Sequence, residues 1–375
     1  MNNLVVGASG SPSRVMFIYL GRRGFSSFAL DVARAAVADD TITATIVVSR
    51  QNGSYASFAE LKEAHLPLDT FKTNAGALLH SWRIPAIRRR LKGAIDQHKP
   101  DMIVELMPHA WSPFIASVFR NAGVRYVVII HDAMPHPGDY RTLSIQWLSR
   151  RTFHQADAVL TLSGSVASNL IASGAVPAEM VRTLFLPTLN IRGSQPIDSP
   201  KVGRSLRLVF FGRIMAYKGL PLFLDMIELL RNRGISVDFA IFGEGDLGAN
   251  KKRIAAMGAE VINRWLTEAE IGTLLPRFHA MVLSHVEASQ SGVAAVALGV
   301  GLPVIATPVG GIPEQITDGV TGLVAKRPDA SALADAAELL LTEPNLHRHI
   351  CSQIAARKED RSSARFVKEV ADLFR

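Results

Sequence analysis

Two cations stand five residues apart in the second half of the chain, where they could hold an anion. In FGRIMAYKGL (211–220), Arg213 and Lys218 follow an apolar run that predicts a strand and precede a predicted helix over 220–233. Gly212 permits a tight turn between the two. A guanidinium and an ammonium at the carboxyl end of a strand, beside a helix N-terminus, favour a phosphate or diphosphate ligand. Two solvated surface charges are the alternative.

A second polar group opens a later apolar helix in SHVEASQSGVAAVALGVGLP (284–303). Glu287 follows a predicted strand, and Gln290, Ser291 and Gly292 begin the helix. Because N–H groups of a first helical turn have no acceptor within the helix, we expect them to be unpaired and able to bind an anion. Glu287 and Gln290 would suit sugar hydroxyls beside that anion. Plain helix capping is the alternative.

A GxGxxG pattern at Gly243, Gly245 and Gly248 raises the possibility of a dinucleotide site. The pattern follows the second predicted strand of its half, and the next strand ends in Asn263 and Arg264, which offer no carboxylate for a ribose hydroxyl. We therefore expect no nicotinamide or flavin cofactor. We expect Gly243 and Gly245 to let the backbone approach a ligand closely.

The elements that position these residues alternate between strand and helix. In the first half we predict strands at 14–20, 42–48, 102–106, 126–130 and 158–162, and helices at 25–37, 75–97 with a break at Pro85, 112–122, 143–153 and 166–173. In the second half we predict strands at 206–211, 237–242, 259–263, 280–284, 303–307 and 322–325. Such alternation predicts parallel sheets covered by helices on both faces.

The fold class is therefore α/β with two doubly wound domains. The segment 190–205 is rich in Gly, Pro and Ser and predicts a linker between a first domain at 13–190 and a second at 203–360. An amphipathic C-terminal helix within 361–375 is expected to pack back on the first domain. A ligand between the domains would meet the carboxyl ends of both sheets.

Composition agrees with a globular protein of two domains. The chain has 375 residues, of which 48% are hydrophobic and 20% charged. A single cysteine, Cys351, excludes an internal disulfide, and residues 1–13 resemble a loose leader without a secretory pattern. We therefore expect a cytoplasmic location.

A basic amphipathic helix is predicted in WRIPAIRRRLKGAI (82–95), which carries Arg88, Arg89 and Arg90 beside an apolar stripe. It would suit an anionic membrane surface, which predicts a peripheral location on the inner face of the cytoplasmic membrane. An ordinary surface helix packed on the core is the alternative. No basic stripe interleaved with aromatic residues accompanies the cluster, so we expect no nucleic acid partner.

These motifs, taken in order, resemble those of a known enzyme family. GRIMAYKG, IFGEGD, SHVEASQSGV…GLPVIATPVGGIPE and DGVTGLV, within residues 206–345, closely resemble the donor-binding domain of the retaining glycosyltransferases of family 4. These "group 1" nucleotide-sugar transferases have the GT-B architecture, in which two Rossmann-like domains face a central cleft. The first half is more loosely similar, through YLGRRGFSSFALDVARA, VIIHDAMPHPGD and ADAVLTLSGSVASNLI.

The resemblance implies roles for particular residues. Arg213 and Lys218 would hold the diphosphate of a nucleoside-diphosphate sugar, and His131 would approach the transferred sugar. Gly21 to Gly24 would form a glycine-rich loop that faces the donor. The candidate catalytic residues are Arg213, Lys218, His131 and Glu287, and the candidate donor-binding residues are Gly21, Gly24, Gly212, Gly243, Gly245, Gln290, Ser291 and Gly292.

The reaction implied is transfer with retention of anomeric configuration, by front-face attack of the acceptor hydroxyl. The acceptor would be a glycan or a lipid-linked saccharide. Because two protein cations serve the diphosphate, a metal is not required, and we expect no cofactor.

One position departs from the family pattern of two glutamates separated by seven residues. Glu287 matches the first only with an offset of one residue, and Val296 stands at the second. Two alternatives therefore stay open, a catalytically silent subunit that binds sugar nucleotides and a GT-B epimerase of sugar nucleotides. A phosphorylase is disfavoured, because no lysine suggests a pyridoxal anchor.

Overall fold

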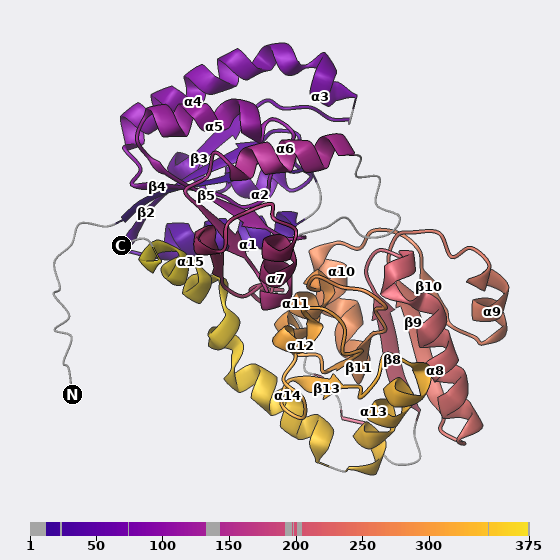
Figure 1. Cartoon of the computed structure of the whole chain (residues 1–375). Coiled ribbons are helices and arrows are strands. Elements are labelled where there is room, and N and C mark those ends of the chain that lie inside the picture. The colour runs from indigo at the N-terminus through magenta and orange to yellow at the C-terminus, as the bar shows by residue number, and fades with distance from the viewer. Residues whose placement is uncertain are drawn as a thin grey trace, which may run out of the picture.

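Two parallel sheets, one in each half of the chain, organise the computed structural model (Figure 1). The structure describes residues 13–22, 25–73, 75–132, 143–191, 197, 199–200, 205–343 and 345–373. Most of the predicted leader and much of the predicted linker lie outside these residues.

Within the described residues the first sheet has seven strands in the order β3-β2-β1-β4-β5-β6-β7, with parallel neighbours. They are β1 Ser13–Tyr19, β2 Ile42–Ser49, β3 His65–Leu68, β4 Met102–Glu105, β5 Arg125–Ile130, β6 Ala158–Thr161 and β7 Val181–Thr183. The helices are α1 Ser26–Ala38, α2 Tyr55–Ala59, α3 Gly76–Leu79, α4 Ile84–His98, α5 Ser112–Asn121, α6 Leu143–Phe153 and α7 Gly164–Ala172, with 3₁₀ turns η1 Lys62–Ala64, η2 Ser81–Arg83 and η3 Ala178–Met180.

The second sheet has six strands within the described part of the chain, in the order β10-β9-β8-β11-β12-β13, also parallel. They are β8 Leu206–Phe211, β9 Val237–Phe242, β10 Glu260–Ile262, β11 Ala280–Leu283, β12 Val304–Ala306 and β13 Gly322–Val324. The helices are α8 Leu220–Asn232, α9 Asn250–Ala256, α10 Glu268–Leu274, α11 Gly292–Gly299, α12 Ile312–Gln315, α13 Ala330–Thr342, α14 Leu346–Ala356 and α15 Ser363–Asp372, with 3₁₀ turns η4 Ala216–Lys218, η5 Leu275–Arg277 and η6 Lys358–Arg361.

The α/β class with two doubly wound sheets is confirmed, and each predicted strand is present to within two residues at either end. The order of each sheet reverses beside its first strand, between β1 and β4 and between β8 and β11. Ligands of doubly wound sheets bind at the carboxyl ends of strands beside such a reversal. The break at Pro85 is also confirmed, since α4 begins at Ile84 with proline in its first turn, where a missing N–H is tolerated.

Two edge strands, β3 and β7, were not predicted. Each pairs with a neighbour on one side only and has three or four residues, so neither shows a long apolar run. Pro67 lies within β3, where the edge position accommodates a residue that cannot donate to a ladder.

Helix α15 contacts α1 of the first domain, although it follows the whole second domain in the sequence (Figure 1). Phe366, Val367 and Val370 are completely buried there. The ring of Phe366 lies 5.7 Å from that of Phe28 and 6.0 Å from that of Phe185, both edge to face. The core of the first domain therefore includes residues from a distant part of the sequence.

Replacing Phe366 with alanine should lower the free energy of unfolding by about 3–5 kcal/mol, because it leaves a cavity between α15 and α1. Urea denaturation followed by circular dichroism measures the change. The matched control is Lys368→Ala on the same helix, whose side chain is 61% exposed and whose effect should stay below about 1 kcal/mol. Equal effects of the two substitutions would contradict the packing described.

Candidate active site

The loops after β8 and β11 carry the residues predicted to bind an anion, and they meet beside the reversal of the second sheet. The N–H of Val286 donates to the carbonyl of Tyr217 at 2.9 Å. The hydroxyl of Ser284 donates to the carbonyls of Lys218 and Gly219, at 3.1 and 3.0 Å. Two motifs that lie roughly 60 to 80 residues apart in the sequence therefore form one hydrogen-bonded unit.

Lys218 points into the protein from this unit. Its side chain is 7% exposed, whereas Arg213 is exposed. A Cβ built on Gly212 would lie 3.4 Å from Lys218 Nζ and 2.7 Å from Val293 in the first turn of α11. The ammonium, the glycine turn and the start of α11 therefore gather at one point, and the alternative of two solvated charges is wrong for Lys218.

Burial and the positive charge of Arg213 lower the pKa of Lys218 from 10.5 to about 7. Desolvation is the larger cause, because it penalises the charged ammonium. A bound anion would supply the missing opposite charge and raise the pKa again.

The start of α11 is only partly available to a ligand. The hydroxyl of Ser291 accepts from the N–H of Ala294 at 3.3 Å, so helix capping is confirmed for Ser291. Our expectation of an unpaired N–H is wrong at Ser291, because its N–H donates to the side-chain oxygen of Gln315 at 2.6 Å. A Cβ on Gly292 would meet nothing within 4 Å, so open space remains beside the first turn.

Gly243 and Gly245 bring two segments of backbone together. A Cβ on Gly243, where φ is 143°, would lie 2.0 Å from the carbonyl oxygen of Gly212. A Cβ on Gly245 would lie 2.5 Å from the carbonyl oxygen of Ile214. The predicted close approach therefore exists, but the partner is the loop that holds Arg213 rather than a ligand.

His131 and Gln290, predicted from different domains, lie side by side. His131 directly follows β5 and is 4% exposed; its Nε2 donates to the carbonyl of Leu106 at 2.8 Å. Since Nε2 carries the hydrogen, Nδ1 accepts, and it lies 3.4 Å from the amide nitrogen of Gln290. His131 therefore makes one hydrogen bond within the first domain and one contact across the domains. The imidazole also lies 3.9 Å from the ring of Phe25, between centroids.

The carbonyl oxygen of the Gln290 side chain is buried without a hydrogen-bond partner among the described residues. Buried polar atoms normally have a partner, so an unpaired acceptor beside His131 is suited to a ligand hydroxyl.

Gly21 and Glu287 lie at the same edges of the two sheets. Gly21 follows β1, and its carbonyl accepts from the side-chain amide of Asn52 at 2.7 Å. Glu287 is exposed in the loop before α11. Gly24 lies outside the described residues. Across the described ranges no group of three His, Cys, Asp or Glu side chains is placed to hold a metal ion.

Glu314 was missed by the sequence analysis although it joins the two domains. Its carboxylate accepts from the N–H groups of Gly164 and Ser165, at 2.6 and 2.9 Å, where the positive end of the α7 dipole favours a negative charge. Nearby, the hydroxyl of Ser163 donates to the carbonyl of Ser289 at 3.0 Å. The available signal was the position of Glu314 in PVGGIPE, in the short helix α12 that follows β12.

Comparisons with known families match both sheets. The family model described as "Glycosyl transferases group 1" matches residues 205–343, and the model described as "Glycosyl transferase 4-like domain" matches residues 23–185. Together the two matches span most of the chain.

Similar proteins include two curated relatives and one solved structure. The chain is 30% identical over 204 residues to the amylovoran biosynthesis glycosyltransferase AmsK of Erwinia amylovora, covering 49% of this chain and 47% of that one. It is 26% identical over 269 residues to the alpha-D-kanosaminyltransferase of Streptomyces kanamyceticus, covering 66% and 68%. The match to AmsK therefore spans about half the length of that relative. HepE of Anabaena, solved in complex with UDP-glucose, shares the fold with a TM-score of 0.69 at 14% identity, over 96% of this chain and 98% of that one.

The affinity of the chain for a nucleoside diphosphate should fall as the pH rises from 7 to 9, by up to about tenfold per unit. Above pH 7 the free protein has lost the proton of Lys218, and the diphosphate must restore it on binding. Isothermal titration calorimetry in buffers of different ionisation enthalpy measures both the affinity and the proton uptake. Lys218→Gln should bind weakly with no such slope. A wild-type affinity that stays constant over this range would contradict the assignment.

Proposed function

We propose that this chain, which belongs to the group 1 glycosyltransferases with GT-B architecture, is a transferase for sugars. It transfers a sugar from a nucleoside diphosphate to a hydroxyl of an acceptor saccharide. The observation that carries the proposal is the buried ammonium of Lys218 beside the first turn of α11, with Arg213 on the same loop. The names of the relatives and the UDP-glucose bound to HepE support this donor class.

The chemistry required of these groups is electrostatic. When the bond from the anomeric carbon to the phosphate oxygen breaks, negative charge develops on the leaving diphosphate. Arg213, Lys218 and the positive end of the α11 dipole would stabilise that charge without reorganisation. Because two protein cations supply this stabilisation, we propose a reaction that needs no metal ion.

For the transferred sugar we propose binding beside the contact of Gln290 with His131. The unpaired oxygen of Gln290 would accept from one sugar hydroxyl, and the adjacent imidazole would border the reacting face. The acceptor hydroxyl would attack from the face that the diphosphate leaves, passing its proton to the departing phosphate oxygen. Such an attack retains the anomeric configuration.

Replacing either Arg213 or Lys218 with alanine should slow donor consumption by about 10²–10³-fold, since each substitution removes a preorganised charge that stabilises the transition state. The wild-type chain is incubated with UDP-, GDP-, ADP- and dTDP-sugars, and release of nucleoside diphosphate is followed with and without a mixture of glycan acceptors. The matched control is Arg207→Ala. Arg207 lies near the start of β8, whereas Arg213 and Lys218 follow the end of that strand.

Different outcomes of this experiment separate the alternatives. Tight binding of a sugar nucleotide without turnover in any acceptor mixture would support the silent subunit that Val296 suggested. Formation of an epimeric sugar nucleotide without an acceptor would support an epimerase.

We also propose that the enzyme works in the cytoplasm at the inner face of the membrane, on a lipid-linked or growing glycan. Helix α4 exposes Arg88 and Arg89, and the preceding segment exposes Leu78 and Leu79 by 82% and 73%. Cations beside exposed leucines suit an anionic bilayer surface. Within the described residues no helix has both the length and the apolar character needed to cross a bilayer.

The double substitution Arg88→Gln with Arg89→Gln should weaken binding to phosphatidylserine vesicles by about tenfold at low salt, since each cation near the surface contributes about 1 kcal/mol before screening. Co-sedimentation with vesicles measures the partition. Neutral phosphatidylcholine vesicles serve as the control. If partition onto the anionic vesicles is unchanged, α4 is an ordinary surface helix.

A further inference from the structure

A cavity of about 320 Å³ lies on the first domain, at the end of β3 and beside the start of α4. Its floor is apolar, formed by Leu68 and Ile87, and its rim carries Asp69, Trp82, Arg83 and Arg90. The volume falls in the range of small-molecule sites, which typically combine an apolar floor with a few polar groups. None of the residues predicted from the sequence to bind donor lies in this cavity.

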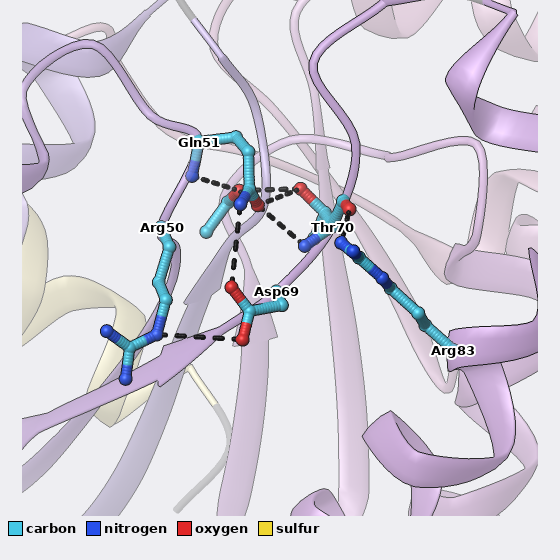
Figure 2. Close-up of polar contacts among 6 residues, drawn as sticks. Arg50, Gln51, Asp69, Thr70 and Arg83 are labelled. Atoms are coloured by element: carbon cyan, nitrogen blue, oxygen red, sulfur yellow. Dashed lines mark hydrogen bonds and ion pairs between the residues drawn. The ribbon is translucent and has the colours of Figure 1, made fainter. Parts of the chain in front are cut away.

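The polar groups on one side of the cavity are held by a hydrogen-bonded network (Figure 2). Asp69 lies 3.7 Å from Arg50 Nε and accepts a long hydrogen bond, 3.5 Å, from the amide of Gln51. The oxygen of that amide accepts from the N–H of Thr70 at 2.7 Å. Arg83 donates to the carbonyl of Thr70 at 2.9 Å. Asp69 and Arg83 are therefore positioned before any ligand arrives, which lowers the entropy cost of binding.

The cavity lining also presents an aromatic face, that of Trp82, and a second cation, Arg90. The indole of Trp82 is 70% exposed, and the guanidinium of Arg83 lies 5.3 Å from its centre. Among the described residues no carboxylate pairs with Arg83 or Arg90, whereas Asp69 already has Arg50 as a partner. The cavity is therefore positive and has a flat apolar wall.

We propose that this cavity binds an anionic sugar residue of the acceptor. The apolar C–H face of a pyranose would pack on Trp82, and its carboxylate or phosphate would lie between Arg83 and Arg90, because guanidinium groups match such anions in geometry and charge. Asp69 would accept from a ring hydroxyl. This inference rests on the proposed function, since it assigns a chemical class to the acceptor.

The position of the cavity says which part of the acceptor it binds. Along the first sheet, β3 is four strand positions from β5, whose end carries His131. At about 4.8 Å between neighbouring strands this is roughly 19 Å, too far for the same sugar to reach both places. The anionic residue therefore lies several units from the reacting hydroxyl, and losing its contacts should raise KM more than it lowers kcat.

Isothermal titration calorimetry of the full chain tests the site with trigalacturonate and glucose 6-phosphate as anionic probes and maltotriose as the neutral control. Arg90→Gln, which removes a charge-assisted contact, and Trp82→Ala, which removes the apolar face under the sugar, should each weaken the binding of an anionic probe by about tenfold. Both side chains lie at the rim, so both variants should fold. Arg89→Gln is the matched control, because Arg89 neighbours Arg90 on α4 without lining the cavity.

Equal weakening by Arg89→Gln and Arg90→Gln would overturn the site, because it would indicate diffuse attraction to a basic helix. Binding of maltotriose as tight as that of trigalacturonate, or no binding of either anionic probe, would also overturn it. Donor hydrolysis by the wild-type chain distinguishes this failure from failure of the proposed function. A chain that hydrolyses a sugar nucleotide but binds no anionic probe refutes only the acceptor site.

Discussion

The burial of one ammonium group, that of Lys218, constrains the second domain more than any other single interaction we describe. A charged amine loses hydration when it is buried, and here Arg213 adds repulsion. The surrounding loops hold it in place nonetheless: the hydroxyl of Ser284 donates to the backbone carbonyl of Lys218, and Gly212, beside the ammonium, is in close backbone contact with Gly243. The free protein thus holds an ammonium group in an unfavourable electrostatic environment, and an anion bound beside it would supply the opposite charge.

A second constraint acts between the domains. The Glu314 carboxylate at the start of α7 and the Gln290 amide beside His131 each connect one sheet to the other. Both contacts join residues that follow strands, because all strands within each sheet are parallel and their carboxyl ends share an edge. His131 of the first domain is therefore set at a defined position relative to the loop before α11 in the second.

Much of this arrangement could be predicted from the sequence. Strand and helix alternation predicted both sheets, since buried parallel strands are continuous apolar runs, and the pairing of Arg213 with Lys218 pointed to a loop that the structure places beside the start of α11. The edge strands β3 and β7 were missed because their apolar runs are too short to stand out. Partners distant in sequence could not be predicted either: the acceptor of the Ser291 N–H is Gln315, and the backbone beside Gly243 is that of Gly212. The cavity beside Trp82 depends on how η2 meets the end of β3, which no local pattern encodes.

The position of α15 has a consequence for how the protein is made. Chains usually fold domain by domain as the ribosome releases them, beginning at the N-terminus. Here the apolar face of α1 around Phe28 stays open to water until residues 363–372 have been synthesised, after the entire second domain. The first domain is therefore completed last. Its apolar surface stays exposed on the nascent chain through most of translation, and such a surface is a natural binding site for a chaperone.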